Sequence, residues 1–453
     1  PAHSLCMLHR VTGGQKYQDL ARQIVDEEFC AQDAQGGWLT GDYLNGPLSG
    51  LEFFELPKPR WESLHPIMAM AELYHLTGEV KYRQAFERIW RSIANLDRHN
   101  NGGFSSGEQA HGNPFLPYPI ETCCTIAWTA MSVEMLRMTG DPRVADELEL
   151  SLLNSITGMH SATGRWATYN TPMDGVRRAS AQDIVFQSRE GTPELNCCSV
   201  NSPRGFGMLS DWAIMRDAEG LVLNWYGPGT IQASLPGRVK VTLAQATDYP
   251  RDGKVLVKVE PARAAEFTLK IRIPGWSRRT TVKVNGQSVK GVQAGSYLAL
   301  RRTWKKGDRV ALTLDLALHY WIGELECAGK TAIYRGPILM TYDRRFNEMD
   351  PDDVPALDAR ALKGRVVAWR GRMPPVLLME FKAMDGRRLR LCDHGSAGEG
   401  GTPYRSWLPV QHTGSDLPQY FASSRLTLDC AELQRFACLV RQYPLFRQQV
   451  ALG

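Results

Sequence analysis

The sequence contains no apolar run that approaches the length needed to cross a lipid bilayer. It also lacks an extended basic block: the densest cationic cluster, Arg387, Arg388 and Arg390, is short, and the formal net charge is only +5. We therefore expect neither a membrane nor a nucleic acid among the partners of this chain. Hydrophobic residues make up 43% and charged residues 22% of the 453 residues, which is typical of a globular protein with a large buried core.

Two other patterns are missing: a signal peptide and the cysteine spacing of a disulfide-rich protein. The chain begins at Pro1, so we expect a fragment or a processed form, and its start does not indicate a compartment. A secreted disulfide framework has dense, evenly spaced cysteines, whereas four of the ten cysteines here stand in two adjacent pairs, Cys123-Cys124 and Cys197-Cys198. Adjacent cysteines rarely bond each other, so reduced thiols that bind a metal explain this pattern better than disulfide bridges.

Three similar helical units come first in the chain. Each unit reads as a helix, a Thr-Gly pair, a short turn and a second helix, with the pairs at 12–13, 77–78 and 139–140. Glycine just after the last helical residue supplies the left-handed conformation that ends a helix, and Asp141-Pro142 is typical of a helix start. Helical hairpins repeated at this spacing predict an α/α toroid or solenoid.

A further helix is predicted from Ser202, as N-cap, and Pro203 to Met215. This gives roughly seven helices, fewer than a closed α/α barrel requires. We therefore expect the barrel to be incomplete on its N-terminal side.

From about Leu221 the apolar residues alternate with a period of two, which predicts strands. Gly, Pro and Asn-Gly separate seven expected strands, at 221–225, 239–243, 255–259, 267–273, 280–284, 296–300 and 309–314. Short strands at this spacing are typical of a β-sandwich. We predict a multidomain α and β protein with an α/α barrel region at 1–218, a β-sandwich at 219–328 and a second β-rich region with a tail at 329–453.

The cysteine pairs lie close to predicted helix starts. Pro117 and Pro119 favour an extended backbone before Glu121, and in an extended segment Glu121 and Cys123 point to the same side. Helix N-termini favour anions and lower the pKa of a thiol. Two loops that bring carboxylate and thiolate groups to one place would form a Zn²⁺ site from Glu121, Cys123, Cys197 and Cys198. The alternative is that these cysteines are buried and pack as small apolar residues.

Glu108 follows the glycine-rich stretch Gly102–Gly107. A carboxylate on such a loop can approach a ligand closely and act as a general acid or base. The alternative is a solvated loop glutamate, which is the usual state of this residue type. Trp128, Trp166 and Tyr169 are able to stack on a sugar ring, although core packing is the favoured role of each.

The ordered set Gly107-Glu108, Glu121-Thr122-Cys123 and Cys197-Cys198, on helical hairpins followed by strands, resembles glycoside hydrolase family 127, the β-L-arabinofuranosidase type. The resemblance extends from the Thr-Gly hairpins to Ile333-Tyr334-Arg335-Gly336-Pro337. It implies an (α/α)6 barrel that carries the active site, followed by β-sandwich domains.

Carried over to this sequence, the resemblance implies that Zn²⁺ is held by Glu121, Cys123, Cys197 and Cys198. It implies that Cys197 is the nucleophile and that Glu108 is the acid/base. The expected reaction is double displacement with retention of configuration.

His65, in His65-Pro66-Ile67-Met68-Ala69, resembles a sugar-contacting histidine; the alternative is a helix-terminal histidine satisfied by the backbone. The expected partner is an oligosaccharide or glycoconjugate, and a homodimer is compatible with the sequence. The segments Gln187–Asn196 and Ser199–Arg204 differ from the family pattern, which leaves the sugar open.

Two other classes of protein share this layout. One is a non-catalytic carbohydrate-binding protein, in which the β-sandwich binds sugar and the cysteines are structural. The other is an α/α-toroid polysaccharide lyase, which requires a Tyr or His base and a group that neutralises a carboxylate. No such set is organised around Tyr118 or His111, so we favour the hydrolase.

Overall fold

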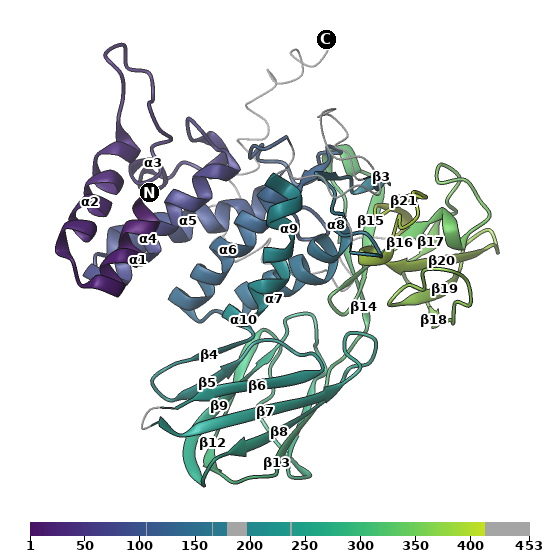
Figure 1. The fold of residues 1–453 in the computed structure, drawn as a ribbon. Coiled ribbons are helices and arrows are strands. Elements are labelled where there is room, and N and C mark those ends of the chain that lie inside the picture. Colours follow the sequence, from purple (N-terminus) through teal and green to yellow (C-terminus); the bar gives the residue numbers. More distant parts are fainter. Residues whose placement is uncertain (106, 165, 179–196, 236–237, 413–453) are drawn as a thin grey trace.

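The computed structural model describes residues 1–105, 107–164, 166–178, 197–235 and 238–412 (Figure 1). A helical region comes first, a β-sandwich follows, and a larger sheet completes the fold, which confirms the predicted multidomain order. The segment 187–196 and the tail 413–453 lie outside the described residues. Within the described ranges, no helix has both the length and the apolar character needed to cross a bilayer.

The three predicted helical hairpins are present. Glycine ends the first helix of each with a positive φ, at Gly13 (71°), Gly78 (75°) and Gly140 (61°). Asp141 caps α7 by accepting a hydrogen bond of 2.9 Å from the Arg143 backbone N–H. The helices are α1 (Ala2–Thr12), α2 (Gln15–Asp26), α3 (Asn45–Ser49), α4 (Leu64–Thr77), α5 (Val80–Leu96), α6 (Thr122–Thr139), α7 (Pro142–Leu150), α8 (Thr157–Met159), α9 (Cys197–Gly207) and α10 (Leu209–Trp212).

The first helices of successive hairpins pack side by side. α1 contacts α4, α4 contacts α6, and α6 contacts α9, while α2, α5 and α7 pack against this row as partners of their own hairpins. α4 and α6 are buried along most of their length, whereas α5 is amphipathic. Trp90 of α5 stacks on Trp128 of α6 with ring centroids 5.3 Å apart. This arrangement of one row of helices against another is that of an α/α toroid.

The predicted helix start at Ser202 is wrong. α9 begins five residues earlier, at Cys197, and Pro203 lies inside it. Proline cannot donate to the carbonyl four residues before it, here that of Ser199. The Ser202 hydroxyl donates to that carbonyl instead, at 3.3 Å, so the helix tolerates the proline.

The β-sandwich consists of a six-stranded sheet, β11-β10-β13-β8-β7-β6, and a four-stranded sheet, β12-β9-β5-β4. All seven predicted strands are confirmed, as β5 (Gly220–Leu223), β7 (Lys240–Thr247), β8 (Lys254–Pro261), β9 (Ala265–Ile273), β10 (Thr281–Val284), β12 (Ser296–Trp304) and β13 (Asp308–Thr313). Their inward side chains form one apolar core. Three strands were not predicted: β4 (Ile214–Arg216), β6 (Gly229–Ser234) and β11 (Gln287–Ser288).

The third region supports the helical region from the side (Figure 1). The main path of its sheet runs β17-β22-β15-β16-β20-β19-β18, and β21 joins it to β3 of the helical region. Tyr334 donates to the Asn100 carbonyl at 2.7 Å, just before the loop that carries Glu108. The strands are β3 (Asp174–Val176), β14 (Leu318–Ile322), β15 (Lys330–Arg335), β16 (Ile338–Asp343), β17 (Leu357–Asp358), β18 (Arg365–Val366), β19 (Leu378–Lys382), β20 (Arg388–Asp393), β21 (Pro403–Arg405) and β22 (Leu408–Gln411).

Candidate active site

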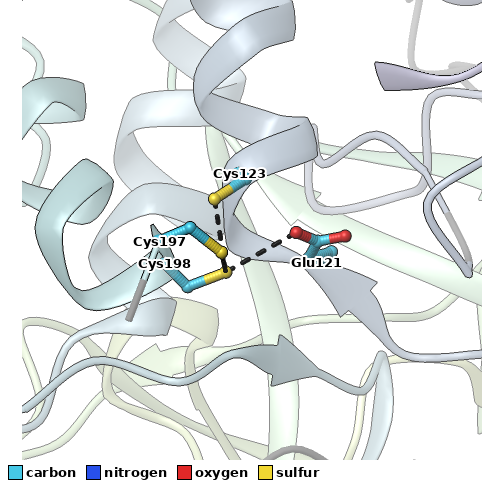
Figure 2. A group of neighbouring side chains, drawn as sticks. All are labelled: Glu121, Cys123, Cys197 and Cys198. Carbon is cyan, nitrogen blue, oxygen red and sulfur yellow. Dashed lines mark hydrogen bonds between the residues drawn. The ribbon is translucent and has the colours of Figure 1, made fainter. Parts of the chain in front are cut away.

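One carboxylate and three thiols converge where β1, α6 and α9 meet (Figure 2). Glu121 ends the short strand β1 (Ile120–Glu121), Cys123 lies in the first turn of α6, and Cys197 and Cys198 open α9. One ligand atom from each of the four residues lies within 4.8 Å of all the others. The structure therefore brings together the four residues that the sequence grouped as a metal site.

The sulfur atoms are in close contact. Cys123 Sγ lies 3.4 Å from Cys198 Sγ, which lies 3.9 Å from Cys197 Sγ and 3.6 Å from Glu121 Oε1 (Figure 2). Cys123 and Cys198 are buried, whereas Cys197 is exposed. Cys197 is thus the one thiol of this group that solvent reaches.

The predicted reason for the convergence of Glu121 and Cys123 is wrong. They do not alternate along one extended segment, because Glu121 has extended backbone angles and Cys123 is already helical. Glu121 is the N-cap of α6, and a residue in the first helical turn lies beside its N-cap. The strand β1 fixes this corner by pairing with β2 (Asn170–Thr171), and the Thr122 N–H donates to the Tyr169 carbonyl at 2.9 Å.

Crowding and burial oppose simultaneous ionisation of the four groups. Burial, followed by the charges of Cys123 and Glu108, raises the pKa of Glu121 to about 8. A hydrogen bond from Cys198 lowers the pKa of Cys123 to about 7, and the same contact raises the pKa of Cys198. Burial, then the Cys123 charge, raises the pKa of Cys197. A bound cation would instead favour ionisation of all four groups, because it attracts all four anions at once.

The donor set fits a metal ion. Three thiols and one carboxylate are the groups that bind soft or borderline divalent cations. Asn201 donates to Cys123 Sγ at 3.3 Å, and Cys124 Sγ donates to the second carboxylate oxygen of Glu121 at 3.4 Å. Such outer contacts orient the ligands of a metal site.

A second group, His3, Glu72 and Glu134, has similar proximity but a different balance of charge. Arg10 and Arg137 both pair with the Glu72 carboxylate, and Arg137 also lies 2.8 Å from Glu134. Two guanidinium groups thus already neutralise the two carboxylates, so this group has no need of a cation.

Glu108 lies on a loop beside the thiols. Its backbone is left-handed, with φ 66°. One carboxylate oxygen is 2.6 Å from Arg60 Nη2, and the other accepts a hydrogen bond of 3.1 Å from the Tyr169 hydroxyl. Tyr169 in turn packs against Cys123 and Cys198. One tyrosine therefore spans the distance between the carboxylate of Glu108 and the sulfur cluster.

The loop that carries Glu108 is held by the segment before α4. The Trp61 N–H donates to the Glu108 carbonyl at 3.2 Å, and the Ala110 N–H donates to the Pro59 carbonyl at 2.9 Å. Trp61 also packs against the cluster of Cys123, Tyr169 and Cys198. This short ladder fixes the backbone of Glu108 relative to the thiols.

His65 lies in the first turn of α4, next to the site. Its ring meets Trp61 edge to face, with centroids 5.9 Å apart. Burial, and then the Arg204 charge, lowers the pKa of His65. The first turns of three neighbouring helices, α4, α6 and α9, thus carry His65, Cys123 and the Cys197-Cys198 pair.

Sequence reasoning missed Arg60 and Trp61 and placed Tyr169 in the core. Tyr169 is 6% exposed, and it also contacts Glu108. Trp128 is fully buried, as expected. Arg60 follows Pro-Lys-Pro and precedes a tryptophan, and nothing in that stretch indicates an acidic partner 48 residues away.

Residues 1–211 match the profile of the β-L-arabinofuranosidase GH127 catalytic domain, and residues 220–316 match that of the GH127 middle domain. The chain belongs to glycoside hydrolase family 127. The resemblance inferred from Glu108, Glu121-Thr122-Cys123 and Cys197-Cys198 is therefore confirmed, and this GH127 chain is a glycoside hydrolase.

The alignments with three relatives cover most of this GH127 chain. The non-reducing end β-L-arabinofuranosidase of Bifidobacterium longum subsp. longum is 25% identical, over 89% of this chain and 68% of its own length. A GH127 β-arabinofuranosidase of known structure superposes with a TM-score of 0.76 at 22% identity, covering 90% of this chain and 68% of the other. The GH127 β-L-arabinofuranosidase of Geobacillus stearothermophilus T6 gives 0.73 at 23% identity, covering 90% and 72%. The two structures establish the common fold.

Proposed function

We propose that this GH127 protein is a retaining hydrolase that releases a terminal β-L-arabinofuranosyl-like sugar from a plant or algal glycan, with Cys197 as nucleophile. The supporting observation is the cluster itself: four ligand atoms lie within 4.8 Å of one another, and Cys197 is the exposed thiol among them. Its relatives of known function are named as β-L-arabinofuranosidases.

Glu121, Cys123, Cys197 and Cys198 would hold Zn²⁺, which prefers thiolate ligands and accepts a carboxylate. When bound, zinc keeps the thiols ionised at neutral pH and lowers their basicity. Four protein ligands match the closed coordination of a zinc site that does not activate water. The nucleophile is therefore assigned to a side chain of the protein.

In the first step the Cys197 sulfur attacks the anomeric carbon while the carbon–oxygen bond to the leaving group breaks. Protonated Glu108 gives its proton to the departing oxygen, which leaves as an alcohol. The sugar is now joined to Cys197 through a carbon–sulfur bond. In the second step ionised Glu108 takes a proton from water, the water oxygen attacks the same carbon, and the sulfur leaves as thiolate. Two inversions give net retention.

The surrounding residues position Glu108 and the sugar. Tyr169 and Arg60 contact the two oxygens of the Glu108 carboxylate. His65 is the proposed hydrogen-bonding partner of the sugar, because it lies beside Trp61 at the same helix ends.

The test determines the anomeric configuration of the first product by proton NMR during hydrolysis of an aryl β-L-arabinofuranoside. Zinc is measured per chain in the same preparation. We expect the β-sugar first, and we expect Cys197→Ser to lower kcat/KM by roughly a thousandfold or more. The matched control, Cys30→Ser, changes a half-buried lone cysteine and should keep activity. An α-product formed first, or an active Cys197→Ser variant, would contradict the proposal.

A further inference from the structure

The edge of the third region concentrates positive charge. Residues 363–390 contain eight Lys or Arg and two Asp or Glu, a net charge of +6, whereas the whole chain carries +5. This stretch forms β18, β19 and the start of β20, at the end of the sheet. In Figure 1 these strands lie well away from α6 and α9, which carry the thiols. The charge therefore belongs to a surface separate from the active site.

Strand register places like charges against each other. Lys382 of β19 lies directly opposite Arg388 of β20, and Glu380 lies between Arg365 and Arg390 on the two neighbouring strands. Both arginines pair with Glu380, at 2.6 and 3.1 Å. One carboxylate therefore serves two cations in that row, and the Lys382–Arg388 row has none.

The surplus cations line a groove. Its volume is about 530 Å³, and its wall includes Lys363, Arg365, Lys382 and Arg388, with Glu380 as the acidic member. Among the described residues, no carboxylate forms an ion pair with Lys363, Lys382 or Arg388; Asp358 lines an adjoining hollow with Lys382. Like charges directly opposite on a sheet are destabilising. The repulsion between Lys382 and Arg388 in this exposed groove is explained if a bound anion offsets it.

We propose that this groove, between β18, β19 and β20, binds the carboxylate groups of an acidic polysaccharide rich in uronic acid. Arginine recognises planar carboxylates through paired N–H donors. Phe381, the aromatic residue of the lining, is only 1% exposed, so the groove offers no ring on which bases of a nucleic acid could stack. The choice of a glycan among polyanions rests on the proposed function. Such a site would hold a polymeric substrate while the sugar branches of that polymer enter the active site.

The test measures binding of the full chain to immobilised polygalacturonate and to its methyl-esterified, uncharged form. We expect binding to the charged polymer, weakened by salt. The variant Lys382→Ser/Arg388→Ser should bind roughly tenfold more weakly. The control Lys258→Ser/Lys283→Ser removes two exposed cations from the β-sandwich and should bind normally. The groove variant should also melt no lower than the wild type, because a repulsive pair is removed.

Equal binding of the two variants, or of the two polymers, would overturn the proposal. Tighter binding to duplex DNA, to anionic lipid vesicles or to a sulfated glycan of equal charge density would also overturn it. Turnover of a small aryl glycoside is measured in parallel and should be unchanged in both variants. If the wild type binds polygalacturonate but does not turn over the aryl glycoside, the proposed function is contradicted, whereas the assignment of the groove stands.

Discussion

Arg60 donates to Glu108 across 2.6 Å, and the same guanidinium holds Glu62 at 3.0 Å. Arg60 thus lies between two carboxylates, one of which is the proposed acid/base. The hydroxyl of Tyr169 contacts the opposite oxygen of Glu108. Glu108 is held from both sides, so its direction is set before a substrate arrives.

Replacing Arg60 with Met should make turnover depend more strongly on the leaving group. For an alkyl glycoside, which departs only when protonated, kcat/KM should fall by about ten- to a hundredfold, because a misplaced Glu108 protonates it poorly. A nitrophenyl glycoside needs little protonation and should be affected much less. Arg60→Lys should restore part of the loss. An equal loss for both substrates would indicate a general structural defect and contradict the positioning role.

Zinc content should differ between variants of the adjacent residues Cys123 and Cys124. Cys123→Ser should lose most of the bound metal, because it removes one ligand of the cluster. Cys124→Ser should keep a single zinc ion per chain, since Cys124 contacts Glu121 from outside the cluster. Metal analysis by mass spectrometry, with melting temperatures before and after chelation, checks this. Equal loss of zinc in both variants would remove the distinction.

The pH dependence of stability should contain a contribution from Asp97. Burial raises the pKa of this carboxyl to about 7, although the backbone N–H groups of His111 and Gly112 donate to it. Its folded-state pKa is above its unfolded value, so its contribution to stability is present below about pH 4 and is lost as the pH rises to about 7. The loss is on the order of 4 kcal/mol.

Asp97→Asn should therefore raise the free energy of unfolding at about pH 8 and flatten its fall between about pH 4 and 7. The amide oxygen can still accept the two backbone hydrogen bonds. Urea unfolding across this pH range gives the measurement. A variant with an unchanged slope would show that Asp97 is not the group responsible.

Arg272 joins the β-sandwich to the helical region. This fully buried side chain of β9 pairs with Asp146 and, at 2.6 Å, with Glu149 of α7. Arg272→Met should lower the free energy of unfolding by about 3–5 kcal/mol, because it leaves buried carboxylates without a counter-charge. Combining it with Asp146→Asn and Glu149→Gln should recover much of the loss. If urea unfolding gives the triple variant the same free energy of unfolding as Arg272→Met alone, this account is contradicted.

Local signals predicted the helical hairpins and the sandwich strands well. Gly13, Gly78 and Gly140 end helices through a backbone conformation that glycine itself favours, and Asp141 caps through its own side chain. These effects act within a few residues, so sequence alone reveals them. The grouping of Glu121 with the cysteines came from a different argument, in which two predicted helix starts bring anionic ligands together, and the family resemblance then supported it.

Contacts that leave no periodic pattern in the sequence account for what was missed. α9 tolerates Pro203 because the Ser202 hydroxyl donates to the Ser199 carbonyl, which Pro203 cannot reach. The pairing of Arg60 with Glu108 depends on a ladder between two distant loops. Neither contact leaves a periodic pattern in the sequence, so neither could be predicted from it.

In the proposed mechanism, the sulfur of Cys197 becomes bonded to the sugar. Peptide mass spectrometry of the Glu108→Gln variant, quenched in acid after reaction with a dinitrophenyl β-L-arabinofuranoside, tests it most directly. The activated leaving group departs without a proton, and the missing base slows release, so a pentosyl adduct should accumulate. We predict that the adduct lies on Cys197. An adduct on a carboxylate, or rapid turnover with no adduct and an inverted product, would contradict the account.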